Sequence, residues 1–154
     1  VRQYLYDVHH YLLFNELKTS KNERIAAIAE KSLKEIAYHL RHNNEWMVRL
    51  GDGTEESHRR MQEAVNSLWT FTGDLFAMNE TDEILIKEGI AVDQNKIKAE
   101  WEKMVKETLQ KATLTIPENQ YMHTGSLEGK HTEHLGFLLA EMQFLPRAYP
   151  GASW

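Results

Sequence analysis

The sequence of 154 residues contains no cysteine. The chain therefore has no disulfide framework, no thiolate ligands for an iron–sulfur cluster and no thiolate nucleophile. A chain without cysteine suits a reducing compartment, and we expect to find the protein in the cytoplasm.

Long apolar segments and a basic stripe are absent as well. No apolar run approaches the roughly 20 residues that a membrane-spanning helix needs, and residues 1–7 lack the basic and apolar regions of a signal peptide. The 18 basic and 23 acidic residues are interspersed and give a net charge of −5, whereas nucleic-acid binding favours a basic stripe. We therefore expect neither a membrane nor a nucleic acid as partner.

Proline is scarce and alternating β-branched runs are few, which favours helices over strands. The chain has only three prolines, and its long stretches are rich in alanine, leucine, glutamate, lysine and methionine, which have high helix propensity. Its length is about that of one domain. The sequence predicts an all-α protein in which residues 1–154 form a single helical domain.

Capping residues and apolar spacing predict the limits of the helices. Ser20 and Glu23 form a capping-box pattern before the longest helix, and Gly51 ends it. Further caps are expected at Thr54, Thr81 and Asp93. The expected helices span residues 2–17, 21–51, 55–78, 82–88, 96–111 and 132–144. Residues 114–130 predict a loop, and Pro146 and Pro150 are expected to close the last helix.

The longest helix carries the first candidate metal ligands. Glu35, His39 and His42 fall within roughly a 60° arc, because successive residues of a helix are rotated by about 100°. Ferritin-like di-iron proteins use a Glu-x-x-His spacing, and Tyr38 occupies the position where that pattern requires the imidazole. Glu35 and His39 also have the i,i+4 spacing of a surface pair. The spacing predicts a degenerate metal site at best.

The first helix carries a second cluster of acid and imidazole. Asp7 and His10 have the di-iron spacing, but with aspartate in place of glutamate. Histidines beside a helical core more often pack or form hydrogen bonds than bind a metal. Asp7, His9 and His10 are therefore equally good candidates for an interface.

The end of the chain combines two imidazoles and a carboxylate with an apolar run. His131, Glu133 and His134 supply ligand types that zinc and iron accept. The same residues precede a helical apolar pattern, which predicts the start of a packed terminal helix. We favour the packed helix, because the cluster lacks intact di-iron spacing on an inward helical face.

Several segments of the chain are typical of one protein family. They are residues 1–7, 25–35, 38–42, 49–61 and 131–151. With these segments the chain resembles the C subunits of bacterial phenylacetyl-CoA epoxidases, in the ferritin-like PaaA/PaaC family. The resemblance covers almost the whole chain and implies a ferritin-like helical bundle. Family members have further helices before the position of Val1, so we expect an N-terminally truncated fragment that lacks the first helices of the fold.

The resemblance also implies where the chemistry takes place. The carboxylate set of the C subunits is degenerate, so these subunits are structural and their partner, the A subunit, holds the di-iron centre. For this chain it implies no catalytic residue and no cofactor. The degenerate candidates for metal ligands are Asp7, His10, Glu35, His39 and His42. The implied function is a scaffold for the oxygenase that epoxidises phenylacetyl-CoA in aerobic phenylacetate degradation, with self-association as a further expectation.

Tryptophan is enriched at permanent interfaces, which makes Trp46, Trp69 and Trp154 candidates for contact with a partner. Burial in the core is the stronger expectation for Trp46 and Trp69. Two other functions stay open. One is a ferritin-like di-iron or manganese oxidoreductase in its own right, with ligands from helices outside this chain. The other is an unrelated helical module that binds a protein.

Overall fold

A computed structural model describes residues 1–153, and every regular element in this range is a helix. The prediction of an all-α protein is confirmed. The chain divides into two compact units, Val1–Thr124 and Gly125–Trp154. The interpretation of residues 1–154 as a single domain stays a prediction.

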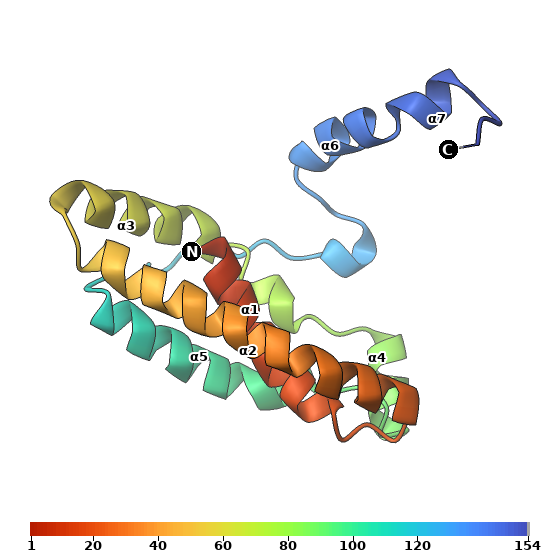
Figure 1. Ribbon diagram of the computed structural model, residues 1–154, viewed down its shortest axis with the longest axis horizontal. Coiled ribbons are helices and arrows are strands. Elements are labelled where there is room, and N and C mark those ends of the chain that lie inside the picture. Colours follow the sequence, from red (N-terminus) through yellow and green to blue (C-terminus); the bar gives the residue numbers. More distant parts are fainter. Residues whose placement is uncertain (154) are drawn as a thin grey trace. The chain divides into compact units, whose positions relative to one another are not determined.

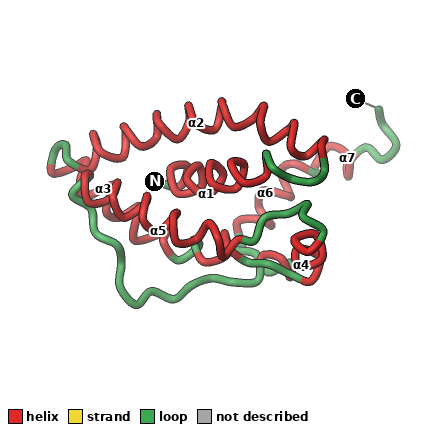
Figure 2. The backbone as a smooth tube through the Cα atoms, turned by 90° about the horizontal axis from the view of Figure 1, so that it is seen from below, coloured by secondary structure: helices red, strands yellow, loops and turns green. Residues whose placement is uncertain are grey.

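The first unit is built around three helices, α1 (Arg2–Leu17), α2 (Glu23–Gly51) and α5 (Gln94–Lys111). Helix α1 packs against both α2 and α5 and lies beneath the long arc of α2 in the view of Figure 2. The core is formed by apolar side chains from these three helices, from α3 (Glu55–Trp69) and from the segments that follow α3 and α5. Its largest fully buried members are Tyr4, Val8, Met47, Val65, Val105 and Leu109.

Helix α1 has the limits that its apolar pattern predicts. Tyr4, Leu5 and Val8 are buried in the core, and two hydrogen bonds join this helix to α5. Tyr4 Oη donates to the carbonyl of Met104 at 3.2 Å, and Trp101 Nε1 donates to the carbonyl of Leu5 at 3.0 Å. Apolar contact and directed hydrogen bonds therefore fix the position of α1 against α5.

The N-terminus of α2 is capped by Asn22, so the prediction of Ser20 as the cap is wrong. Asn22 Oδ1 accepts hydrogen bonds from the backbone N–H groups of Arg24 and Ile25. The Ser20 hydroxyl instead donates to the carbonyl of Ile90 at 2.8 Å. Both residue types favour capping, and a contact from a distant loop decides between them. The end of α2 at Gly51 is confirmed.

Helix α3 (Glu55–Trp69) is capped by Thr54 as predicted, but it ends well before Met78. Figure 1 shows α3 turning back alongside the C-terminal part of α2. Its end coincides with hydroxyl groups that bind backbone carbonyls, Thr70 to Tyr121 and Thr72 to Trp69. Such bonds compete with helix continuation, and the chain proceeds into the short 3-10 helix η1 (Gly73–Phe76).

Helix α4 (Glu80–Lys87) is capped by Asn79, so the prediction of Thr81 as its cap is also wrong. Asn79 and Asp82 form a reciprocal capping box. Gly89 follows the helix with a φ of +75°, a conformation that glycine adopts readily. The predicted stop at this glycine is confirmed. Asp93 caps α5 as predicted, although α5 begins at Gln94 and thus before Lys96.

The second unit contains the 3-10 helix η2 (Ser126–Glu128) and the helices α6 (His134–Met142) and α7 (Phe144–Ala148). Pro146 lies in the first turn of α7, where a proline needs no N–H partner, so its predicted role as a terminator is wrong. None of residues 125–153 is buried. The terminal helix is therefore not packed within its own unit, and its packing against another surface stays a prediction.

No helix within residues 1–153 is both long enough and apolar enough to cross a membrane.

Candidate functional site

Asp7 is a buried carboxylate on α1, only 5% exposed. Its Oδ1 accepts a hydrogen bond from Gln3 Nε2 at 2.6 Å, and its Oδ2 accepts one from Asn43 Nδ2 at 2.7 Å. Burial of a carboxylate is costly unless donors replace the lost water, and these two amide groups supply that replacement. Both carboxylate oxygens are therefore engaged by neutral donors, and amide NH2 groups are not metal ligands.

The two amides that bind Asp7 are functional residues that the sequence pattern did not single out. The i,i+4 spacing of Gln3 and Asp7 is a signal in the sequence, because such residues are neighbours on a helix. Asn43 is 36 positions from Asp7 and lies on α2. No spacing rule connects the two, and the packing of α1 against α2 alone brings them together.

His9 is buried on the side of α1 that faces η1 and the start of α5. Its Nε2 lies 2.9 Å from Oε1 of Gln94, and its ring meets the Phe76 ring edge-on with centroids 5.4 Å apart. Burial lowers the pKa of His9 below its ordinary value of 6.5, while the contacts with Gln94 and the Leu75 backbone oppose that shift. Because desolvation disfavours the imidazolium, the folded protein holds His9 in its neutral form at pH 7.

The lowered pKa of His9 predicts a pH dependence of stability. Between the ordinary pKa of 6.5 and the lower pKa in the folded state, the unfolded chain binds more protons at this site. The stabilisation is therefore complete above pH 6.5 and is lost as the pH falls below that value. We expect the free energy of unfolding of the wild type, measured relative to that of His9→Gln, to decrease from pH 7 downward. A constant difference between the two proteins across this range would contradict the prediction.

His10 lies in a row of aromatic rings along α1. Its ring centroid is 3.9 Å from that of Tyr6 and 5.6 Å from that of Phe14. Burial lowers the pKa of His10, the charge of His9 lowers it further, and Asp7 opposes both effects. The His10 ring thus serves as a half-buried aromatic side chain in this arrangement.

Glu35 and His39 form an i,i+4 side-chain pair on the solvent side of α2. Glu35 Oε1 lies 3.5 Å from His39 Nε2, and the two side chains are 79% and 49% exposed. An exposed pair of this kind contributes only about 0–1 kcal/mol to stability. The structure confirms the interpretation of these two residues as an i,i+4 surface pair.

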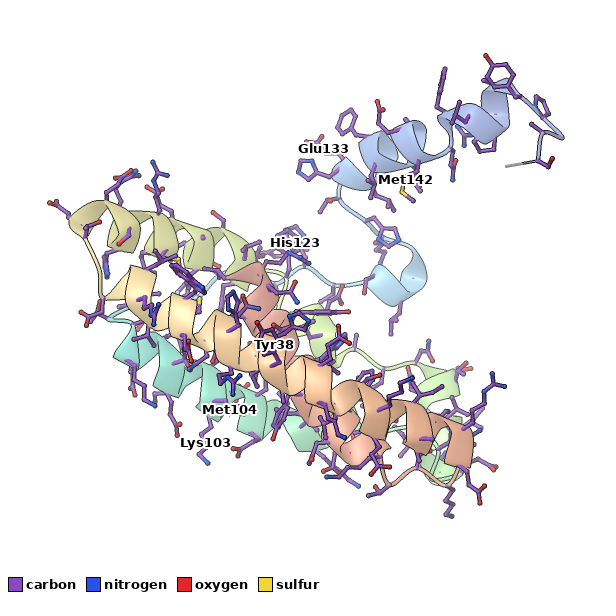
Figure 3. All side chains as sticks on the ribbon, viewed as in Figure 1. Tyr38, Lys103, Met104, His123, Glu133 and Met142 are labelled. Carbon is purple, nitrogen blue, oxygen red and sulfur yellow. The ribbon has the colours of Figure 1, made fainter. Side chains whose placement is uncertain are left out.

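His42 belongs to a row of exposed rings that also contains Tyr38 and Trp46. The rings of Tyr38 and His42 are stacked at 6.3 Å with an interplanar angle of 18°. The guanidinium of Arg41 lies 5.8 Å from the Tyr38 ring, and that of Arg49 lies 5.8 Å from the Trp46 ring. Figure 3 labels Tyr38 on α2. This row faces solvent.

The three tryptophans proposed from the sequence differ in their surroundings. Trp46 is 45% exposed, so its predicted burial is wrong. Trp69 packs against the core, as predicted, with its ring 5.9 Å from that of Trp101. Trp154 lies outside the described residues.

The candidate ligands do not gather into one donor set. Within residues 1–153, no group of three or more His, Asp or Glu side chains is placed to hold a metal ion. Asp7 is bound by amides, His10 packs between two rings that are tilted to it, and the candidates on α2 are exposed. The donors of the described residues therefore do not fit a di-iron centre, while the absence of a metal from the protein stays a prediction.

The terminal cluster is exposed within its own unit. His134 is the first residue of α6, and Glu133 precedes it without a capping hydrogen bond from its side chain. His131 lies in the preceding loop. The three side chains are all exposed, and they are not among any described group that could bind a metal.

The first unit has two larger clefts, and no histidine lines either of them. One, of about 370 Å³, lies between α1, α2 and α5. The other, of about 380 Å³, is lined chiefly by rings, aliphatic side chains and two lysines, with Glu102 as its single acid. Neither cleft brings a nucleophile and a histidine together, so neither matches the nucleophile–histidine template for covalent catalysis.

Comparison with known proteins gives two findings. The sequence profile of the family described as phenylacetic acid catabolic protein, PaaA_PaaC, matches residues 1–154. The chain is also similar to the C subunit of 1,2-phenylacetyl-CoA epoxidase from Escherichia coli (strain K12), with 48% identity over 153 residues. That match covers 99% of this chain and 62% of the relative, so the chain spans less than two thirds of the relative's length.

Proposed function

Because this chain belongs to the family of phenylacetic acid catabolic proteins, we propose that it is a structural subunit of a multicomponent phenylacetyl-CoA epoxidase. The relative in Escherichia coli is named as the C subunit of such an enzyme. In this proposal the chain supports a catalytic A subunit that holds the di-iron centre and epoxidises the ring of phenylacetyl-CoA. The chain itself contributes no ligand and no reacting group.

The observation that supports the proposal most directly is the hydrogen bonding of the buried Asp7 carboxylate. This carboxylate is the buried acid on α1 in the di-iron spacing, and both of its oxygens accept hydrogen bonds from amides. A di-iron carboxylate site needs several acids and imidazoles that face one interior point. Here the acid is engaged in a structural hydrogen-bond network between α1 and α2. Such a network stabilises a scaffold, and among residues 1–153 no set of further acids and imidazoles joins Asp7.

The surroundings of the other candidates support the same role. The imidazoles of His9 and His10 are held neutral by burial and pack among rings. The exposed face of α2 presents aromatic rings with two arginines beside them, residue types that are enriched at protein interfaces. The location that we propose is the cytoplasm, because a chain without cysteine suits a reducing compartment.

Co-expression with a candidate A subunit tests this function. We expect the two proteins to co-purify, iron to belong to the A subunit, and epoxidation of phenylacetyl-CoA to fall when this chain is omitted. Asp7→Asn is the informative variant. An oxidoreductase that uses Asp7 as a ligand would lose its metal and activity, whereas a structural Asp7 would affect only stability. Two irons per chain in this protein purified alone, with oxygen activation, would contradict the proposal.

A further inference from the structure

The cleft of about 370 Å³ between α1, α2 and α5 has the size of a small-molecule site. Such sites occupy about 300–1,000 Å³ and combine apolar walls with a few polar groups that orient the ligand. The three helices around this cleft pack against one another and supply side chains to the core. The shape of the cleft is therefore set by the packing of the first unit, and its polar groups decide what it can bind.

Apolar groups form the walls of the cleft. Leu40 of α2 and Met104 of α5 line it, together with Tyr4 and Tyr11 from α1. Figure 3 labels Met104 on α5. Aromatic rings attract one another in offset or edge-on arrangements, and methionine sulfur makes favourable contacts with aromatic rings. These walls suit a ligand whose apolar part is a small aromatic ring.

Two buried hydroxyl groups of the lining have partners within the protein. Tyr4 and Thr108 are 2% and 7% exposed. The Tyr4 hydroxyl donates to the Met104 carbonyl, and the Thr108 hydroxyl donates to Asn44 Oδ1 at 2.7 Å. Burial raises the pKa of Tyr4 to about 12, so this hydroxyl is neutral at pH 7. Tyr4 therefore adds no negative charge to the cleft.

The bond from Thr108 also orients the amide of Asn44. Because Oδ1 accepts from Thr108, Nδ2 is on the other branch of the amide and has no hydrogen-bond partner within residues 1–153. This nitrogen is not among the buried polar atoms that lack a partner, so it is open to solvent. Asn44 lines the cleft, and its NH2 group offers two donors to a ligand there.

Arg41 alone carries a charge among the described residues that line the cleft. Its guanidinium has no ion pair within residues 1–153. Arg41 and Asn44 have the i,i+3 spacing of neighbours on a helix surface, so both can reach one ligand group. A guanidinium forms strong, often bidentate hydrogen bonds with a carboxylate. The cleft is therefore complementary to a group with a single negative charge.

We propose that this cleft binds a small aromatic monocarboxylate. The carboxylate lies on the Arg41 guanidinium and the Asn44 amide, and the ring packs against Met104. The site is separate from the proposed function, because it requires neither a metal nor a partner subunit. A nucleotide or a CoA thioester does not fit, since its several phosphate charges exceed the one cation of the lining.

The second cleft, of about 380 Å³, is a poorer site for the same ligand. Its lining includes Glu102, which has i,i+4 spacing to both Lys98 and Lys106 along α5. The acid offsets the charge of the lysines and repels a carboxylate. Met122 lines this second cleft, as Met104 lines the first. Each cleft thus has a methionine methyl group that can report on binding.

Phenylacetate is the probe for the site, because it joins one ring to one carboxylate through a short arm. Isothermal titration calorimetry with the full chain at constant ionic strength should give a Kd of about 1 mM or lower. 2-Phenylethanol keeps the ring but has no charge, and we expect it to bind at least about tenfold more weakly. No binding of phenylacetate up to about 10 mM, or equal affinity for the two compounds, would overturn the proposal.

Arg41→Gln tests the cation, and Arg49→Gln is the matched control. Both guanidinium groups lie 5.8 Å from an aromatic ring of α2, but only Arg41 lines the cleft. We expect Arg41→Gln to weaken phenylacetate binding at least about tenfold and Arg49→Gln to leave it unchanged. Equal effects of the two substitutions would assign the binding to general surface charge and reject the site.

The position of the ligand can be read from the wild type without relying on the arginine variants. With 13C-methyl methionine labels, the Met104 signal should move when phenylacetate is added, while the Met122 signal stays in place. Met104→Leu assigns the signal, because this exchange nearly conserves volume. A shift confined to Met122 would place the ligand in the second cleft, and no shift of either signal would place it elsewhere. Both results contradict the proposal.

Discussion

Trp101→Ala is expected to lower the free energy of unfolding by about 4 kcal/mol, in the range of large-to-small substitutions in protein cores. Trp101 is 2% exposed and stands in the core that joins α1 and α5. Its ring lies against those of Trp69 and Phe76, with centroids 5.9 Å and 5.4 Å away. Alanine would leave a cavity that these rigid rings cannot fill, and the missing atoms cost packing as well as burial.

The hydrogen bond of Trp101 adds a second contribution. Its Nε1 donates to the carbonyl of Leu5, and Trp101→Phe would remove that donor while it keeps most of the ring. We expect Trp101→Phe to cost about 1–3 kcal/mol, less than the alanine variant, because it leaves a smaller cavity and one weakened polar contact. The order of the two losses separates the effect of the ring from that of the hydrogen bond.

Trp46→Ala is the matched control, since it makes the same substitution at an exposed position. Trp46 is involved in contacts with the His42 ring and the Arg49 guanidinium on the outside of α2. Loss of these contacts should cost less than about 1 kcal/mol. Chemical denaturation with fluorescence and circular dichroism measures all three variants. Equal losses for Trp101→Ala and Trp46→Ala would contradict the assignment of Trp101 to the core.

Gly51→Ala is expected to cost about 3 kcal/mol, at the upper end of the usual range for overpacking. Gly51 is the buried last residue of α2. A Cβ at this position would lie 2.7 Å from the Cβ of Ala112, and it would also collide with the Ala112 carbonyl oxygen. Because the neighbour is backbone, a side-chain rotation cannot relieve the contact, and α2 must move away from the end of α5.

That movement would also disturb the junction of three helices. The Gly51 carbonyl accepts hydrogen bonds from His58 Nδ1 at 2.8 Å and from the Thr113 hydroxyl at 3.2 Å. These bonds connect the end of α2 to α3 and to the residue after the cap of α5. Alanine favours helix over glycine by about 0.5–1 kcal/mol, a gain that is smaller than the cost of the collision.

Gly136→Ala is the control for this substitution. Gly136 lies in α6, and a Cβ at this position would meet no atom within 4 Å. Its effect should be neutral or stabilising by up to about 1 kcal/mol, the difference in helix propensity. Thermal and chemical unfolding of both variants gives the comparison. A neutral Gly51→Ala would show that the end of α2 does not pack closely on Ala112.

Local chemistry explains which helix limits could be predicted. Asp93 caps α5, Thr54 caps α3 and Gly89 follows α4 as their residue types predict, because a cap depends on atoms two or three residues away. Ser20 and Asn22 are both good caps, and the bond from Ser20 to Ile90 settled the choice. The contact of Thr70 with Tyr121 similarly ends α3 early, a contact that no local rule reveals.

The candidate site likewise has features that local spacing predicts and features that depend on contacts between distant residues. The i,i+4 rule predicted the surface pair of Glu35 and His39. The di-iron pattern requires an imidazole at position 38, where this chain has a tyrosine. The partner of Asp7 could not be predicted, because Asn43 approaches it only through packing of α1 on α2. Sequence spacing can name the acids, but it cannot show which donors reach them.

By itself, the sequence determined the helical class, the caps Thr54 and Asp93 and the family of this protein, because helix propensity, capping and recognisable segments are properties of neighbouring residues. The tertiary structure decided the environment of each side chain. It buried Asp7 and engaged both its oxygens, kept Trp46 exposed and left residues 134–149 uncovered within their unit. Burial and hydrogen-bond partners depend on elements that are distant in sequence, and packing alone brings those elements together.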